Sequence, residues 1–424
     1  MSRLSRVLAA ALALALSAPA ASSAADRLEK VVILSRHGVR AAMSTPERLE
    51  EASARPWPRF EVPAGHLTAR GAQLVEQMGG YYRALYLAEG LLKPGDCGQL
   101  YVWANVTQRT IATGEAYARA LAPGCPVVVN TVGEGRDDPL FEPVKTGAAK
   151  LDPALARAAV AGRVGGDLAA WSASHRQEVE TLDAFLMQCP KGPCAASPGK
   201  RRALDARPGF AEGGEMVELA GPEAFASGIT ESLLMAWADG RDFAGLGWKG
   251  VDAQGLTPLF FLHQAEFDLR LRTPYVAKVL AGGLAQRLLA TLEAGAGLVE
   301  GDAAAMGPDE AKIVLIAGHD GTVAALGGLL RAEWSLPGYQ PNQIQPGGAL
   351  VFERWLRDDG QRVIRVRYTG QGLEQLRAAT PLSLSAPPLS SPVFIPGCGS
   401  ATPAFDCSVR DLRAVLDRNL AVGP

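Results

Sequence analysis

The chain has 424 residues, with 42 basic and 44 acidic side chains and a formal net charge of −2. A balance this close to neutral argues against nucleic acid or an anionic membrane surface as a partner, since both attract strongly basic chains. The length suffices for one large domain or for two interlocked domains.

The first 24 residues have the pattern of an export signal. Arg3 and Arg6 precede an Ala/Leu run from Val7 to Leu16, and small residues continue to Ala25. The apolar run is shorter than the roughly 20 residues that a membrane-spanning helix needs. We therefore predict a signal peptide over 1–24 and a periplasmic or secreted protein that has no membrane attachment after cleavage. We also expect a monomer.

The periodicity of the remaining chain predicts alternating strands and helices. Four apolar runs rich in β-branched residues predict buried strands over 31–34, 100–103, 127–129 and 313–317. Amphipathic spacing predicts helices over 67–87, 107–121 and 322–330. Two later strands, 349–355 and 363–368, flank Asp358-Asp359-Gly360, which is typical of a hairpin. These elements predict an α/β fold in which helices flank a mixed central sheet.

The middle of the chain has a different character. Residues 151–255 are rich in Ala, Gly and charged side chains, with helical patches at 181–187 and 228–238 and no clear strand. We predict a mostly helical insertion domain over 151–255. The α/β domain would then consist of residues 26–150 and 256–424.

Six cysteines form three local couples. An even number of cysteines in an exported chain favours disulfides, and none of the couples has the spacing of a zinc site. Pairing each cysteine with its nearest neighbour in the sequence, which closes the shortest loops, predicts the disulfides Cys97–Cys125, Cys189–Cys194 and Cys398–Cys407. We expect neither a metal ion nor another cofactor.

Three groups of polar residues follow predicted strands. The segment Arg36-His37-Gly38-Val39-Arg40 follows the first strand, Arg109 comes shortly after the second, and His319-Asp320 follows the strand at 313–317. Ligands of open α/β sheets bind outside the carboxyl ends of the strands, so we expect the three groups to converge.

The residue types of this cluster suit phosphoryl transfer. His37 lies between two cations whose repulsion keeps its imidazole neutral and nucleophilic. Arg36, Arg40 and Arg109 can hold phosphate oxygens, with His319 as a further donor. Asp320 can protonate the departing alkoxide. Taken alone, Arg109 would be an ordinary helix residue and His319-Asp320 a helix-capping pair.

These motifs resemble those of the histidine acid phosphatases (clade 2 histidine phosphatases), and among them the bacterial periplasmic phytases. Segment 36–40 matches the nucleophile motif of the family, and Arg109 matches its distal arginine. His319-Asp320 matches the proton-donor pair, while 65–71, 138–141 and 346–355 resemble three further family segments. The resemblance implies a metal-independent phosphomonoesterase that acts on phytate and related sugar or inositol phosphates. It also implies a phosphohistidine intermediate on His37 and a helical domain inserted in the α/β domain.

The chain departs from the family pattern at several positions. Gly321-Thr322 follows the proton-donor pair where Thr-Asn or Ser-Asn is usual, and Thr107 replaces an aspartate, which we expect to loosen Arg109. Met43-Ser44 replaces Thr-Lys, which removes contacts for a highly anionic substrate.

The resemblance also places Met43, Glu231 and Arg272 near the substrate pocket, although Glu231 and Arg272 fit ordinary surface charges almost as well. His66, His175 and His263 are interpreted as structural, and the glycosylation sequon at 105–107 is discounted.

Two alternatives to a phytase-like enzyme remain at this point. One is a glucose-1-phosphatase or a broad-specificity acid phosphatase. The other is a phosphosugar-binding protein without catalytic activity, which is disfavoured because a carboxylate beside a bound polyanion weakens binding. A small phosphate monoester is the expected partner in each case.

Overall fold

The structure is a computed structural model that describes residues 26–189, 198–214, 216–297 and 303–421. The predicted signal peptide and Cys194 lie outside these ranges. No helix in the described ranges is both long and apolar enough to cross a membrane.

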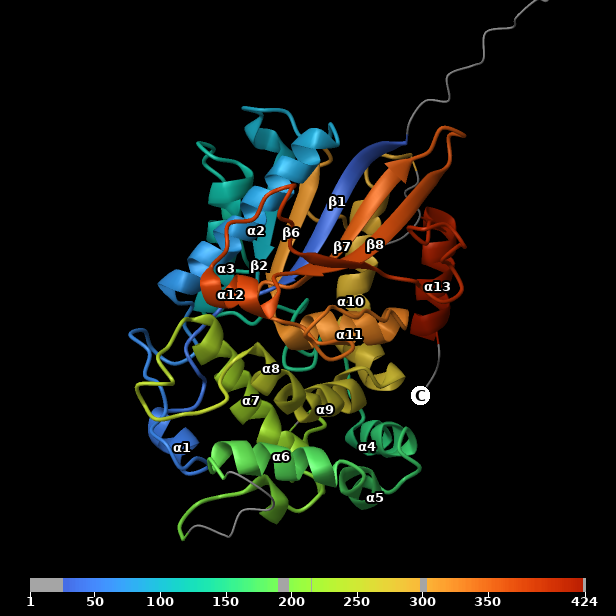
Figure 1. Cartoon of the computed structure of the whole chain (residues 1–424). Helices are drawn as coiled ribbons and strands as arrows, with labels where there is room; N and C mark the ends of the chain where they lie inside the picture. The colour runs from blue at the N-terminus through green and yellow to red at the C-terminus, as the bar shows by residue number, and fades with distance from the viewer. Residues whose placement is uncertain (1–25, 190–197, 215, 298–302, 422–424) are drawn as a thin grey trace, which may run out of the picture.

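A mixed sheet forms the centre of the fold, as predicted (Figure 1). Strand β1 (Arg27–Arg36) lies between β6 (Ile313–Gly318), to which it is parallel, and β7 (Ala349–Leu356), to which it is antiparallel. Beyond β6 come the parallel strands β2 (Leu100–Ala104) and β3 (Val129–Asn130). Beyond β7 come the antiparallel strands β8 (Arg362–Gly370), β9 (Leu389–Pro392) and β10 (Cys407–Ser408).

Alternating side chains of β1 enter two separate cores, as the two-residue period of a strand requires. Val31 and Ile33 pack on one face with side chains of α2 (Ala69–Ala88) and α3 (Gln108–Leu121). Val32 and Leu34 pack on the other face with side chains of three further helices. These are α10 (Pro274–Glu293), α11 (Asp320–Leu330) and α13 (Val409–Ala421). Because both faces are covered, the middle of β1 is the continuous apolar run 31–34 in the sequence.

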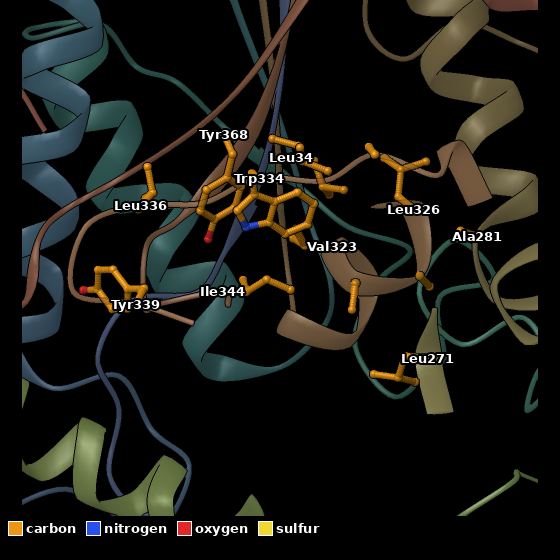
Figure 2. Close-up of a cluster of buried hydrophobic side chains, with 14 of the residues drawn as sticks. Leu34, Leu271, Ala281, Val323, Leu326, Trp334, Leu336, Tyr339, Ile344 and Tyr368 are labelled. Carbon is orange, nitrogen blue, oxygen red and sulfur yellow. The ribbon is translucent and has the colours of Figure 1, made fainter. Parts of the chain in front are cut away.

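Two large aromatic rings, those of Trp334 and Tyr368, pack in the core that also contains Leu34 of β1. Figure 2 shows Trp334 and Tyr368 with their rings stacked, 4.6 Å between centroids, close to Leu34 and Val323. Both rings are buried. This packing anchors the segment after α11 to the sheet.

The remaining described helices lie mostly beyond the lower end of the sheet in Figure 1. They are α1 (Pro46–Glu50), α4 (Pro153–Gly162), α5 (Leu168–Ala173), α6 (Arg176–Leu186), α7 (Pro222–Ala238), α8 (Ala253–Leu256), α9 (Phe261–Leu271) and α12 (Leu373–Ala378). Helix α9 packs against α7.

The middle region, in which the sequence shows no clear strand, contains one short strand pair. Strands β4 (Gly209–Phe210) and β5 (Leu219–Ala220) form a small antiparallel pair there. Each is only two residues long, so neither produces a periodic pattern that a sequence could reveal. The predicted strand over 127–129 is likewise shifted, since β3 begins only at Val129.

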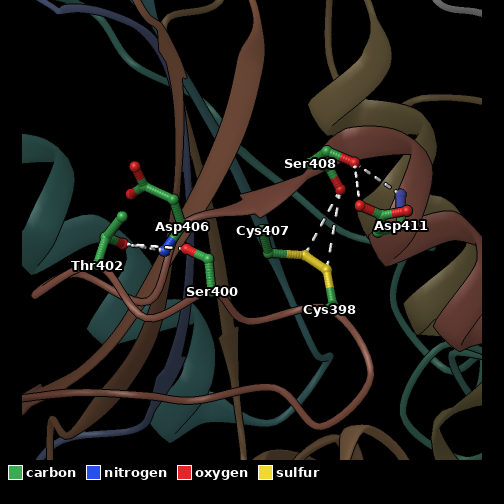
Figure 3. Close-up of a disulfide and its surroundings, with 7 residues drawn as sticks. All are labelled: Cys398, Ser400, Thr402, Asp406, Cys407, Ser408 and Asp411. Atoms are coloured by element: carbon green, nitrogen blue, oxygen red, sulfur yellow. Dashed lines mark hydrogen bonds between the residues drawn. A yellow bond between two sulfur atoms is a disulfide. The ribbon is translucent and has the colours of Figure 1, made fainter.

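Two of the predicted disulfides are confirmed. Cys97–Cys125 joins the turn before β2 to the segment after α3, with Cα atoms 5.4 Å apart. Cys398–Cys407 ties β10 to the preceding loop, with Cα atoms 5.0 Å apart (Figure 3). The third predicted pair includes Cys194 and lies outside the described residues.

Candidate active site

The three predicted groups meet at one edge of the sheet, beyond the carboxyl ends of β1, β6 and β2. The His37 amide donates to the Gly318 carbonyl oxygen at 2.9 Å, and the Asn105 amide donates to the Ala317 carbonyl oxygen at 3.1 Å. These bonds continue the parallel ladder past the strand ends. The convergence that strand order predicted is therefore present in the fold.

His37 is buried, with 2% of its surface exposed. Its Nδ1 lies 2.9 Å from the Gly38 carbonyl oxygen, which can only accept, so Nδ1 carries the proton and Nε2 keeps a free lone pair. Burial, Arg36 and Arg40 together hold the pKa of His37 well below its ordinary value. This shift favours the neutral imidazole, the form that can act as a nucleophile.

Close packing explains the glycine after this histidine. A Cβ on Gly38 would lie 2.9 Å from the Gly71 carbonyl oxygen and 2.7 Å from a methyl group of Val75. The Gly38 amide also donates to Thr113 Oγ1 at 3.0 Å. Only glycine lets helix α2 approach the loop that carries His37 this closely.

Arg36 and Arg40 share a carboxylate that arrives from α7. Arg36 is fully buried, and its Nη2 bonds Glu231 Oε1. Arg40 Nη2 lies 3.4 Å from the same oxygen. Glu231 is 8% exposed, so it is no ordinary surface charge. Its position between the two guanidinium groups indicates that it orients the arginines rather than simply lining an entrance.

Asp320 is the first residue of α11. Its Oδ2 lies 2.9 Å from Arg36 Nη2, and its Oδ1 accepts from the Gly321 amide at 2.8 Å. Burial by itself raises the pKa of Asp320, but Arg36 and the other positive neighbours outweigh it and hold the pKa below its ordinary value. Asp320 is therefore ionised in the free protein.

His319 links the pair His319-Asp320 to Arg109 and to Asn105, which follows β2. Its Nε2 donates to Asn105 Oδ1 at 3.2 Å, which leaves Nδ1 to accept from Arg109 Nη2 at 3.4 Å. Its ring stands edge-on to that of His37, with centroids 5.6 Å apart. Burial and Arg109 lower the pKa of His319 to about 4, so this ring is also neutral at moderately acid pH.

Asn105 is a site residue that the sequence analysis missed. It was considered only as part of a glycosylation sequon, yet its side chain is fully buried. The signal that could have found it is its place directly after β2, the same rule that identified the other groups. No described carboxylate forms an ion pair with Arg109, in agreement with the threonine at position 107.

The predicted pocket residues have different locations. Met43 is 58% exposed, and its Sδ lies 2.8 Å from where a Cβ of Gly65 would stand, with Arg109 Nη1 3.6 Å from that point. Met43 thus lies close to Arg109. Arg272 was expected near the substrate pocket, but its side chain does not line the cluster. It is buried against the segment after α11, where its Nη2 lies 2.7 Å from the Ala332 carbonyl oxygen.

Two of the other histidines have structural partners, as expected. His175 Nδ1 lies 2.9 Å from Glu223 Oε1, and His263 Nδ1 lies 2.8 Å from Ser227 Oγ. Within the described ranges, no three His, Cys, Asp or Glu side chains come together in a way that could hold a metal ion.

Comparison with known proteins identifies the family of this fold. A model of the histidine phosphatase superfamily (branch 2) matches residues 27–369. Phytase AppA of Escherichia coli (strain K12) is 34% identical over 414 residues, covering 95% of this chain and 94% of that protein. A glucose-1-phosphatase of Providencia rettgeri is 26% identical, covering 98% of this chain and 99% of that protein. The solved structure of Hafnia alvei phytase in complex with tartrate superposes with a TM-score of 0.83 at 35% identity, covering 94% of this chain and 98% of that chain.

Proposed function

Because this chain belongs to the histidine phosphatase superfamily (branch 2), it is a phosphoric monoester hydrolase, and we propose that it is a phytase-like acid phosphatase. Its substrates would be phytate and related sugar or inositol phosphates. The observation that supports this proposal best is the buried His37 between Arg36 and Arg40, with its pKa lowered and with Asp320 bound to the guanidinium group of Arg36.

The first chemical step transfers the phosphoryl group to the protein. Arg36, Arg40 and Arg109 neutralise the phosphate oxygens while His37 Nε2 attacks phosphorus. The bond from phosphorus to the ester oxygen breaks as the N–P bond forms. Asp320 gives its proton to that oxygen, so the alcohol leaves in neutral form.

The second step releases phosphate. A water molecule attacks the phosphohistidine, and the Asp320 carboxylate accepts a proton from that water. The N–P bond breaks, and His37 regains its lone pair. Asp320 is protonated at the end of this step, loses that proton once phosphate has left, and takes up a proton again when the next substrate binds.

A glucose-1-phosphatase is the second candidate function. The similarity to the Providencia rettgeri enzyme over nearly the whole chain favours it, as does Ser44 at a position where the phytase pattern has a lysine. A substrate with a single phosphate needs fewer cations than phytate does. Both candidates use the same chemistry at His37 and differ only in the alcohol that leaves.

The cellular location and the domain division also belong to this proposal. The pattern of residues 1–24 supports export to the periplasm or the medium. Residues 151–255 would form the helical insertion, and the mature protein would act as a monomer without nucleic-acid partners.

One experiment tests the proposed function directly. Phosphate release is measured at acid pH with phytate, glucose 1-phosphate and p-nitrophenyl phosphate, for the wild type and for His37→Ala. The variant is expected to lose activity on all three substrates, whereas His175→Gln, a histidine change outside the cluster, retains it. A wild-type rate on phytate near background, with the other substrates fast, would favour the sugar phosphatase. Activity that persists in His37→Ala would overturn the proposed mechanism.

A further inference from the structure

A second pocket, of about 480 Å³, lies between α9, α5, the end of α4 and the loop segment 340–342 (Figure 1). Its volume falls within the range of about 300–1,000 Å³ that is typical of small-molecule sites. Among its described lining residues, none belongs to the cluster of arginines, histidines and carboxylates at the candidate active site. The pocket is therefore a separate place at which a ligand could bind.

A buried amide of α9 belongs to the lining of this pocket. Gln264 is 8% exposed, and its side-chain amide has no hydrogen-bond partner among the described residues. The amide offers two N–H donors and a carbonyl acceptor, and a buried polar group without a partner costs free energy. The indole N–H of Trp171, in the same lining, also has no partner within the described ranges. A ligand that both donates and accepts hydrogen bonds would satisfy these groups.

Two aromatic rings form the apolar part of the lining, and one histidine contacts both. The ring of Trp171 stands edge-on to that of His175, with centroids 4.8 Å apart. The ring of Phe261 stands edge-on to the same imidazole, with centroids 5.2 Å apart. His175 is itself bound to the buried carboxylate of Glu223. The two aromatic rings are thus fixed in place and offer apolar surface to the C–H groups of a ligand.

The charged groups of this pocket are already paired. Arg163 and Asp268 are the two charged side chains in its described lining, and Arg163 Nη2 lies 2.7 Å from Asp268 Oδ2. Asp268 Oδ1 also lies 3.1 Å from Arg272 Nε, and Arg163 Nη1 donates to the Asp268 carbonyl oxygen. A phosphate group would have to compete with a carboxylate for the single guanidinium group of the lining. The pocket therefore suits an uncharged ligand.

The loop wall of the pocket is held by hydrogen bonds to its neighbours. Gln340 Nε2 donates to the Thr257 carbonyl oxygen at 3.0 Å, and Asn342 Oδ1 accepts from the Trp334 amide at 3.0 Å. The Asn342 amide donates to the Trp334 carbonyl oxygen at 2.9 Å. The side-chain carbonyl oxygen of Gln340 has no partner among the described residues, so this wall adds an acceptor for a ligand.

From these observations we infer a second binding site, for an uncharged cyclic polyol such as a sugar or cyclitol ring, in the pocket that Gln264, Trp171 and Gln340 line. The C–H face of the ring packs on the indole of Trp171, and its hydroxyl groups bond the two glutamine amides. Each hydroxyl both donates and accepts, which matches an amide; an aromatic hydrocarbon would leave the buried amide without a partner. This inference goes beyond the proposed function, because the pocket contains none of the reacting groups.

NMR titration of the whole protein with methyl α-glucopyranoside and with myo-inositol tests the inference. Saturating inorganic phosphate is present, so that the catalytic cluster is occupied. We expect at least one ring to bind, and the ring that binds more tightly identifies the ligand as a sugar or a cyclitol. Gln264→Leu should weaken this binding about three- to tenfold, as the loss of one hydrogen bond implies. Gln177→Leu, at an exposed glutamine of α6, is the matched control and should leave the affinity unchanged.

Trp171→Ala should weaken the same binding by about tenfold, because the ring loses its aromatic partner. Binding of neither ring by the wild type, or equal affinities in the wild type and Gln264→Leu, would overturn the inference. Binding that is seen only without phosphate would place the ring at the catalytic cluster and would also overturn it. Gln264→Leu should release phosphate from p-nitrophenyl phosphate at the wild-type rate, so the polyol site and the proposed function are tested separately.

Discussion

Replacing Asp320 by Asn separates protonation of the leaving group from formation of the phosphoenzyme. The amide keeps the size of the side chain but cannot donate a proton to an alkoxide. Alkyl esters such as phytate have poor leaving groups and need that proton, whereas the phenolate of p-nitrophenyl phosphate leaves without much protonation. The first step should therefore slow on phytate much more than on the aryl ester.

Two effects of opposite sign follow from the contacts of Asp320. General acid catalysis contributes about 10²–10⁴-fold, so the rate on phytate should fall by that factor, with a far smaller loss on the aryl ester. The carboxylate also lies 2.9 Å from Arg36 and repels bound phosphate. A charge about 5 Å away at an effective dielectric near 20 contributes about 3 kcal/mol, so Asp320→Asn should bind inorganic phosphate at least tenfold more tightly.

Rapid-quench trapping of labelled phosphohistidine with both substrates measures the rate of phosphoenzyme formation. Inhibition by inorganic phosphate measures the affinity for bound phosphate. Asp411→Asn, at a carboxylate near the start of α13, serves as the matched control and should change neither quantity. Equal losses on the aryl and alkyl esters would refute Asp320 as the acid and leave it a positioning role. Tighter phosphate binding with wild-type turnover would also contradict the assignment.

Three further predictions concern other parts of the structure. Arg40→Gln removes a charge that lowers the pKa of His37, so the pKa should rise and the acid limb of the kcat/KM profile should move to higher pH; an unmoved limb would contradict this electrostatic role. Activity should survive dialysis against a chelator, because arginines supply the positive charge at the site; loss that a divalent metal restores would show otherwise. Replacing Cys97 and Cys125 by alanine should lower the free energy of unfolding by about 3–4 kcal/mol in denaturant titration, and an unchanged value would argue against this role of the disulfide.

The sequence predicted the parts of the fold that depend on local pattern. Strand β1 was identifiable because burial on both faces makes it a continuous apolar run. The convergence of His37, Arg109 and His319 was expected because each follows a predicted strand, and ligands bind outside the carboxyl ends of the strands in such sheets. Glu231 could be carried over by resemblance, but its pairing with Arg36 could not be derived, since 195 residues separate the two and only the packing of α7 brings them together.

The failures also have physical reasons. Arg272 matches a pocket residue of the family, but here Glu333 and the Trp334 ring hold its guanidinium group away from the cluster. The pair β4–β5 is too short to produce a period. Asn105 was overlooked because its sequence context suggested a surface modification, whereas its amide is buried and fixes the tautomer of His319.

The charges of the site explain how one aspartate can be ionised before substrate binds and protonated afterwards. Among these described groups, Arg36 and Arg40 contact the carboxylates of Glu231 and Asp320, and Arg109 adds a third guanidinium group, so three positive charges stand against two negative ones. In that state Arg36 stabilises the Asp320 carboxylate and lowers its pKa. A bound phosphate dianion makes the cluster net negative and competes for the same guanidinium group, so the pKa of Asp320 must rise. In the proposed mechanism the substrate itself therefore creates the acid, and activity should decline as the pH rises above that substrate-dependent pKa.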